Sequence, residues 1–384
     1  MRNYISLIIL AVILCVFLSG CGKSEKTVGL VVTIEQGDSE KYSEDKESLN
    51  YFYSVMNEEQ RKIYSIYDNL MEHFNEDDYS CEIRFSADLY DEATFTDIFR
   101  TVYIGYYRDH PECYPLSMDA VDEEMILVSS WLDEKKNEYC FSFIQGKKYK
   151  DYDKELKEME TAADEFLKDI DLNAGDREVA LAIHDKLISQ VEYSEITNYG
   201  KEENSIIDYS RCAYGALVQD NNGERNAVCV GYSAAYQYLL KKAGIKCTTI
   251  SGYGVMVKSD GTYGKGDYHI WNAACIDDSW YEFDLTVDDM GPNDLDISDE
   301  KFREIHRDIN EETRHNYDRL FFMISSEEMK DRKTEFPYTF EDGTTKNVYI
   351  RYKHFRDDEL EENGIEVLLR QKFEMPLTEM YPDT

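Results

Sequence analysis

The chain has 384 residues, 42% of them hydrophobic, which is enough for about two domains with buried cores. Its 79 acidic residues outnumber its 42 basic residues and give a formal net charge of −37. Such a chain repels the phosphate backbone of nucleic acids and anionic lipid headgroups, so we expect no nucleic-acid partner.

The first twenty residues have the features of an export signal. Arg2 supplies a positive charge, and an apolar run of about signal-peptide length follows it. The run ends in LSGC, which resembles the lipobox of bacterial lipoproteins. That resemblance implies a signal peptide over 1–20, a lipid on Cys21, and a chain anchored in the cell membrane on its extracytoplasmic side. The alternative is an uncleaved anchor, although the run is shorter than the ~20 residues that a spanning helix needs.

Two regions follow the signal. Residues 21–50 are polar and charged apart from one short apolar patch, which predicts a tether. Residues 51–150 combine a helical pattern at 58–74 with three runs typical of strands, which predicts a small α+β region. The strand-like runs are CEIRFSA, EMILVSSWL and EYCFSFIQGKKY.

Residues 151–330 are predicted to form a second domain. Helical patterns cover 154–170 and 176–191, the latter with Asp176 as the expected N-cap, and a third begins near residue 229. Strands are expected next, at 246–257, 268–276 and 279–287, followed by an acidic loop at 288–302. Residues 331–384 are predicted to form a carboxy-terminal extension, with a hairpin turned at Asp342-Gly343 and a helix at 357–373.

Cys229 stands where an apolar run turns into the third helix. At a helix amino terminus, free N–H groups and the helix dipole stabilise an anion, so a cysteine there is favoured as a thiolate nucleophile. The alternative is a small buried hydrophobic residue. The helix is indicated by apolar residues on one face and ends at a glycine; these residues are Val230, Ala234, Ala235, Tyr238, Leu239 and Gly244.

A cysteine nucleophile needs a base and a group that orients the base. Of the seven histidines, His269 opens a strand directly after a glycine-rich loop, where a side chain can face a cleft. If Asp277 and Asp278 form a two-residue turn, Asp284 lies on the same sheet face as His269, diagonally ~7–8 Å away between backbones. A three-residue turn would place Asp284 on the opposite face.

Two segments around these residues, NAVCVGYSAAYQYLLKKAGI and YHIWNAACIDDSWYEFDLT, resemble the core of the transglutaminase-like superfamily. The resemblance covers about residues 175–290. It implies a papain-like α+β fold, in which a helix carrying Cys229 packs on an antiparallel sheet carrying His269 and Asp284. One departure is Leu285, where many members have proline.

The resemblance also implies a reaction. Cys229 attacks an amide or ester carbonyl of a protein or peptide to form a thioester, His269 transfers protons, and Asp284 orients His269. Water as the acceptor gives hydrolysis, and a lysine amine gives a cross-link. No cofactor is expected, and no metal either, because the acidic loop does not have the EF-hand pattern.

Two other functions remain open from the sequence. The chain could be a non-enzymatic surface lipoprotein that uses this scaffold for binding, or a structural lipoprotein with Cys229 in a disulfide. Besides Cys15, Cys21 and Cys229, six cysteines remain, which is compatible with three disulfides or with none.

Overall fold

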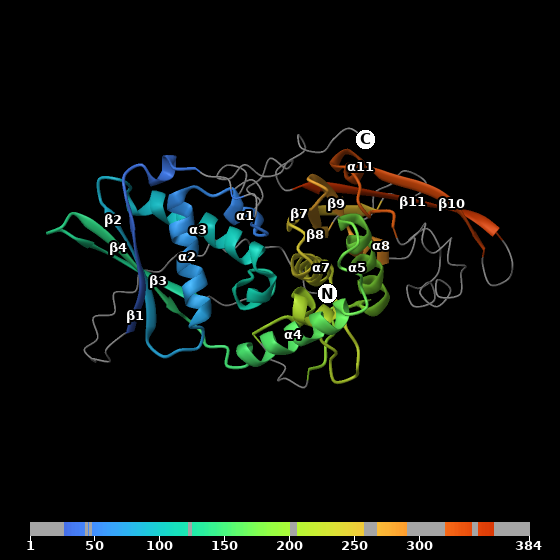
Figure 1. The fold of residues 1–384 in the computed structure, drawn as a ribbon, viewed down its shortest axis with the longest axis horizontal. Helices are drawn as coiled ribbons and strands as arrows, with labels where there is room; N and C mark the ends of the chain where they lie inside the picture. Colours follow the sequence, from blue (N-terminus) through green and yellow to red (C-terminus); the bar gives the residue numbers. More distant parts are fainter. Residues whose placement is uncertain are drawn as a thin grey trace. The chain divides into compact units, whose positions relative to one another are not determined.

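The computed structural model describes residues 27–42, 45, 48–121, 125–199, 206–256, 267–289, 319–339 and 345–356 (Figure 1). These residues form two compact units that alternate along the chain. Unit 1 takes those within 1–41, 57–100 and 124–149, and unit 2 takes those within 42–56, 101–123 and 150–384. Within the described ranges, none of the helices combines the length and hydrophobicity that a membrane span requires.

Unit 1 is built on a four-stranded sheet. The strands are β1 (Thr27–Ile34), β2 (Tyr79–Ser86), β3 (Ile126–Asp133) and β4 (Glu138–Gln145), in the order β1-β2-β4-β3. Strand β1 is parallel to β2, and the other pairs are antiparallel. Helix α2 (Glu58–Glu72) begins at a capping box formed by Asn57 and Gln60 and packs on β1 and β2. An aromatic cluster fills the core, namely Phe85, Phe95, Phe99, Phe141 and Phe143.

The amino-terminal predictions for this region need two corrections. The expected tether over 21–50 contains β1, because its apolar patch pairs with β2 and thereby satisfies its backbone hydrogen bonds. Helix α3 (Glu92–Asp109) was not predicted at all. It starts in unit 1 and ends in unit 2, so the predicted boundary at residue 150 does not separate the two units.

Unit 2 contains a five-stranded antiparallel sheet in the order β10-β11-β7-β8-β9. Its strands are β7 (Cys247–Met256), β8 (Asp267–Ile276), β9 (Ser279–Phe283), β10 (Arg332–Thr339) and β11 (Thr345–Arg356). Helix α7 (Cys229–Lys242) packs against β7 and β8 and is contacted by α5 (Asp176–Gln190) and α8 (Leu285–Asp289) (Figure 1). The fold is therefore α+β, with a cysteine-bearing helix on an antiparallel sheet, as expected.

Shorter elements complete the two units. Helix α4 (Tyr152–Leu167) packs against α6 (Ala213–Leu217), and β5 (Glu192–Tyr193) pairs with β6 (Asn226–Ala227). The remaining elements are α1 (Tyr51–Ser54), α11 (Ser326–Lys330) and the 3-10 turns η1 (Asp38–Glu40), η2 (Pro111–Leu116) and η3 (Tyr209–Arg211).

The carboxy-terminal prediction is corrected in the same way. Residues 331–384 were expected to be an extension outside the domain 151–330, but the β10–β11 hairpin joins the central sheet through β11 and β7. The predicted turn at Asp342-Gly343, the helix at 357–373, Cys21 and the acidic loop beyond residue 289 lie outside the described residues.

Two local details also differ from expectation. The strand expected at 279–287 ends at Phe283, and α8 follows it. Gly175 rather than Asp176 is the N-cap of α5.

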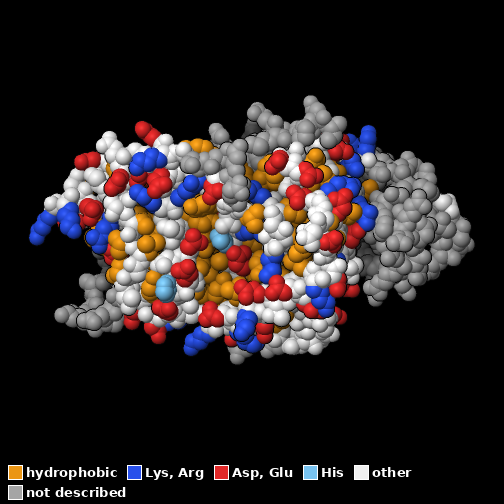
Figure 2. Space-filling view, viewed as in Figure 1, with side chains coloured by type: hydrophobic (Ala, Val, Ile, Leu, Met, Phe, Trp, Pro, Cys, Tyr) orange, Lys and Arg blue, Asp and Glu red, His pale blue; other side chains and the backbone are white. Residues whose placement is uncertain are grey.

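All seven cysteines of the described residues are free thiols, so no disulfide joins them. Figure 2 shows acidic side chains spread over the visible face with basic ones between them.

The turn between β8 and β9 provides a test of the register. Asp277 and Asp278 both have positive φ, 50° and 64°, which is the geometry of a two-residue hairpin turn. Asp278→Gly and Asp278→Ala remove the same charge, but only glycine adopts positive φ without steric cost. We expect the glycine variant to be more stable than the alanine variant by about 1 kcal/mol in urea denaturation. Equal stabilities would contradict this turn geometry.

Candidate active site

Cys229 is the first residue of helix α7. The preceding strand β6 pairs with β5, and Val228 takes an extended conformation as the N-cap while its N–H donates to the Ser210 carbonyl, 2.9 Å away. Gly231 allows this close approach, because a Cβ there would lie 2.4 Å from the Ser210 oxygen. The thiol therefore stands at the positive end of a buried helix.

His269 and Asp284 are brought together by the β8–β9 hairpin. The pairs Ile276–Ser279 and Asn272–Phe283 are in the register that the two-residue turn predicts, and Asp284 directly follows β9. The His269 Nε2 atom lies 2.6 Å from Asp284 Oδ2, within hydrogen-bonding distance. The structure therefore places these two side chains on one face of the sheet, as the sequence predicts.

The third candidate residue completes the cluster. Cys229 lies close enough to His269 to contribute to the raised pKa of that ring, and the His269 Nε2 atom faces Asp284. Burial alone would lower the pKa of His269, but the charge and hydrogen bond of Asp284 and the contact with Cys229 raise it from 6.5 to about 10. Burial alone would raise the pKa of Asp284, but the imidazoles beside it hold that pKa well below its ordinary value. The geometry and these charges are those of a nucleophile, a base and an orienting carboxylate.

A fourth side chain in this cluster was missed by the sequence analysis. His354, on β11, places its Nε2 atom 2.6 Å from the same Asp284 Oδ2 atom that His269 contacts. Its Nδ1 atom lies 3.0 Å from the Met329 carbonyl oxygen, and the ring is buried. Strand alternation could have indicated which face of the hairpin His354 occupies, but not that β11 pairs with β7.

Another histidine–carboxylate pair lies on helix α5. His184 was expected to be packed within a helix, and it is fully buried, with Nε2 3.0 Å from Asp288 Oδ2 and Nδ1 3.1 Å from Asp185 Oδ1. Arg319 forms an ion pair with Asp185. This pair links α5 to α8 through two fully buried side chains. His306 and His315 lie outside the described residues.

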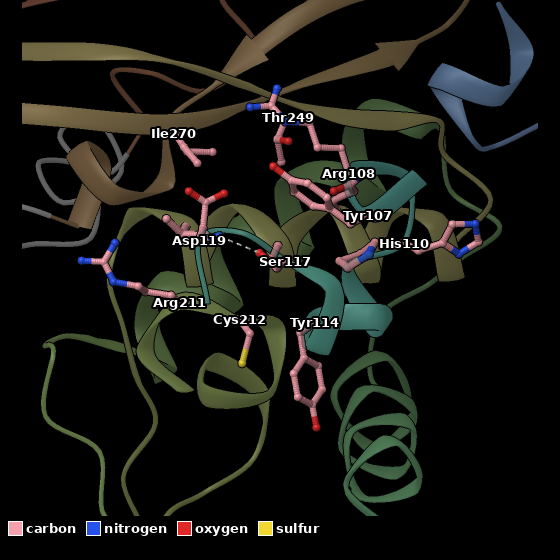
Figure 3. Close-up of a pocket in the computed structure, with 14 residues that line it drawn as sticks. Tyr107, Arg108, His110, Tyr114, Ser117, Asp119, Arg211, Cys212, Thr249 and Ile270 are labelled. Carbon is pink, nitrogen blue, oxygen red and sulfur yellow. Dashed lines mark hydrogen bonds between the residues drawn. The ribbon is translucent and has the colours of Figure 1, made fainter. Parts of the chain in front are cut away.

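A pocket of about 40 Å³ adjoins the nucleophile within unit 2 (Figure 3). Val230 and Ile270 line it and also pack against Cys229. Figure 3 shows the charged side chains Arg108, Asp119 and Arg211 around it. The pocket therefore has an apolar wall formed by residues that pack against Cys229, and its lining includes groups of both charges.

Among the described residues, two groups of side chains have the types of atoms that bind metals. His269, Asp284 and His354 form one group, and His110, Glu112 and Cys113 form the other, each with ligand atoms within 4.8 Å of one another. In the first group, the Nε2 atoms of His269 and His354 each lie 2.6 Å from Asp284 Oδ2, which is a hydrogen-bond length. Protons on these nitrogens are enough to account for both contacts. That the protein requires no metal stays a prediction.

Parts of the chain are similar to a protein family and to solved structures. The model of the transglutaminase-like superfamily matches residues 164–285, a range that includes Cys229, His269 and Asp284. A crystal structure from Cytophaga hutchinsonii, named as a proposed cysteine protease, is 16% identical with a TM-score of 0.23 and covers 44% of this chain and 67% of its own. None of the curated proteins matches the chain in sequence.

The raised pKa of His269 predicts a pH dependence of stability. Because the pKa is about 10 in the folded protein and about 6.5 in the unfolded chain, its contribution is complete below pH 6.5 and is lost as the pH rises to about 10. We expect His269→Gln to lose about 5 kcal/mol of this pH-dependent unfolding free energy, measured by denaturation from pH 6.5 to 10. Asp278→Gly, which changes only the turn, should keep the wild-type slope. A His269→Gln slope equal to wild type would disprove the assignment.

Proposed function

Because residues 164–285 belong to the transglutaminase-like superfamily, we propose that the chain is a thiol-dependent enzyme that cleaves or transfers amide bonds of proteins or peptides. The observation that carries the proposal is the cluster of three residues: Cys229 at the start of a helix, His269 beside it, and Asp284 with Oδ2 2.6 Å from the His269 Nε2 atom. In that cluster the three residues have the roles of nucleophile, base and orienting group.

The reaction follows from this geometry. Cys229 attacks the carbonyl carbon as a thiolate while His269 holds the proton, and the backbone N–H groups at the start of α7 face the developing oxyanion. His269 then donates its proton to the departing amine, which leaves a thioester on Cys229. An acceptor, either water or an amine, gives its proton to His269 and releases the acyl group. Asp284 remains ionised and keeps the ring oriented throughout.

Selective alkylation tests the nucleophile. Burial raises the pKa of the thiols of Cys81 (to about 11), Cys140, Cys247 and Cys275, whereas Cys229 stands at a helix amino terminus beside the His269 imidazole. We expect iodoacetamide at pH 6 to label Cys229 at least tenfold faster than any other cysteine, located by peptide mass. His269→Ala should remove this preference, and Asp278→Gly should leave it intact.

The outcome of that labelling also distinguishes the alternative functions. Equal labelling of several thiols would favour a binding protein that retains the scaffold without the chemistry. A disulfide on Cys229 would favour a structural lipoprotein.

A second assay identifies whether water or an amine is the acceptor. A glutamine-containing protein is incubated with a tagged amine, and both tag incorporation and fragment formation are recorded for wild type and Cys229→Ser. Incorporation that requires Cys229 identifies a cross-linking transferase, and fragments without incorporation identify a peptidase. Neither product would contradict the proposed reaction on this class of substrates.

We also propose that the chain is anchored to the extracytoplasmic side of the cell membrane through lipidated Cys21. The support is the sequence alone: a positive residue, an apolar run and the LSGC ending. In cells, Cys21→Ser should move the protein out of the lipid-modified membrane fraction, detected by labelling with a fatty-acid analogue. Cys15→Ser, inside the apolar run, is the matched control and should keep the label. An equal label on both variants would contradict lipidation at Cys21.

A further inference from the structure

His354 is built into the proposed active site from a distant part of the chain. It lies on β11, where it pairs with Gly254 of β7, and it reaches Asp284 across 70 positions of sequence. Its ring packs among Trp271, Phe321 and Tyr352, with ring centroids 4.9, 5.5 and 4.8 Å away. A ring enclosed in this way cannot exchange its partners for water, so its two nitrogens must be satisfied by the groups beside them.

The hydrogen-bond inventory fixes where the protons of His354 are. The Met329 carbonyl oxygen only accepts hydrogen bonds, so the Nδ1 atom 3.0 Å away carries a proton. Asp284 is ionised, because the imidazoles beside it outweigh the effect of burial on its pKa. An ionised carboxylate also only accepts, so the Nε2 atom 2.6 Å away carries a proton too. A histidine with protons on both nitrogens is an imidazolium cation.

The Asp284 carboxylate is fully occupied by this arrangement. Oδ2 accepts from both His269 and His354, and Oδ1 accepts the N–H of Val287 at 3.2 Å. Three donors from β8, β11 and α8 therefore fix the plane of the carboxylate. The ring centroids of the two histidines are 5.6 Å apart, close enough for the charge on one to affect the protonation of the other.

We propose that His354 is a positioning residue of this site: as a cation on Asp284 it holds the carboxylate toward His269 and offsets part of its charge. This inference rests on the proposed function, because it assigns His354 a role in the same reaction. Without His354, the whole charge of Asp284 would act on His269 and hold the proton on its ring. With it, His269 is oriented equally well but releases its proton to the leaving amine more readily.

Other titratable groups face this cluster from the elements packed around it. Cys229 lies beyond His269 on α7, and Asp288 on α8 interacts electrostatically with Asp284. Glu282 on β9 accepts from the Trp271 indole at 2.6 Å, and Tyr352 lies on the same strand as His354. Helix α11 contributes the Met329 carbonyl. The carboxylates of Asp288 and Glu282 are bound to other donors. Their charges therefore act on the wild-type protein and on His354 variants alike.

The first test reads the protons directly and does not depend on any activity. Nitrogen-15 NMR of the full-length, chelator-treated wild-type protein should show, at pH 7, two slowly exchanging ring N–H protons on His354, whose signals are told apart from those of His269 by cross-peaks to Phe321 as well as to the Trp271 indole. A single ring proton on His354 would overturn the proposal. A zinc ion on the cluster would also leave Nε2 without a proton, so the same spectrum would then favour a metal site.

The second test uses the pH profile of Cys229 alkylation, which a purely structural role would not move. His354→Gln keeps one donor but carries no charge. Removing a cation makes every neighbouring proton harder to lose, so both limbs of the profile should shift to higher pH by about one unit. Asp278→Gly, which removes an exposed charge in the β8–β9 turn, is the control and should leave the midpoints in place. Unmoved midpoints in His354→Gln would overturn the proposal.

The two tests separate this inference from the proposed function. An imidazolium at His354 and shifted midpoints in a protein that processes no peptide would leave the positioning role intact and remove the acyl-transfer reaction. Acyl transfer by a protein in which His354 carries a single ring proton would support the reaction and remove the positioning role. If His354→Gln does not fold, the wild-type spectrum alone decides the matter.

Discussion

The buried carboxylate of Asp284 is the interaction on which the arrangement of unit 2 depends. It lies where three separate pieces of the chain meet, namely the β8–β9 hairpin, the start of α8 and strand β11. Burying an ion is costly unless donors surround it, and here three donors do so. The cost of that burial means that the strand order β11-β7-β8-β9 and the position of α8 are coupled to the charge at the site. The chemistry of this cluster and the stability of the sheet therefore depend on the same contacts.

The parts of the site that follow from local rules were predictable from the sequence. Helix periodicity places Cys229 at an amino terminus, and a turn of two residues fixes which sheet face Asp284 occupies, since a slip of one residue would reverse it. His354 obeys no local rule, because its position depends on a hairpin pairing with a strand about a hundred residues earlier. For the same reason β1 was taken for part of a tether, since an eight-residue strand gains its stability only from the partner to which it pairs. Helix α3 was missed because its residues up to 100 belong to unit 1 and those from 101 belong to unit 2. Its pattern therefore lacks one clear apolar face.

The division into units shows a similar limit of sequence reading. Contiguous domain boundaries were assumed, but unit 2 takes in residues from 42–56 and 101–123 as well as its carboxy-terminal part. Asp109, at the end of α3, accepts the N–H groups of Phe52 and Tyr53 at 3.0 and 2.9 Å, and Gln237 of α7 donates to the Arg108 carbonyl at 2.7 Å. The helix that carries Cys229 is thus supported by residues far earlier in the chain. The superfamily match over 164–285 includes Cys229, His269 and Asp284 but covers neither this support nor His354.

A carboxylate shared by two imidazoles resolves a conflict in the proposed reaction. The base must be charged enough to favour a thiolate beside it, yet it must give its proton to a departing amine, which it does best when its pKa is near the working pH. A lone buried aspartate serves only the first need, because it stabilises the imidazolium through the whole reaction. A second cation on the same oxygen keeps the orientation while it weakens that stabilisation. Because the second imidazole arrives on β11, the strength of the base is set by a strand outside the segment that carries the three reacting residues, and it can change without altering any of them.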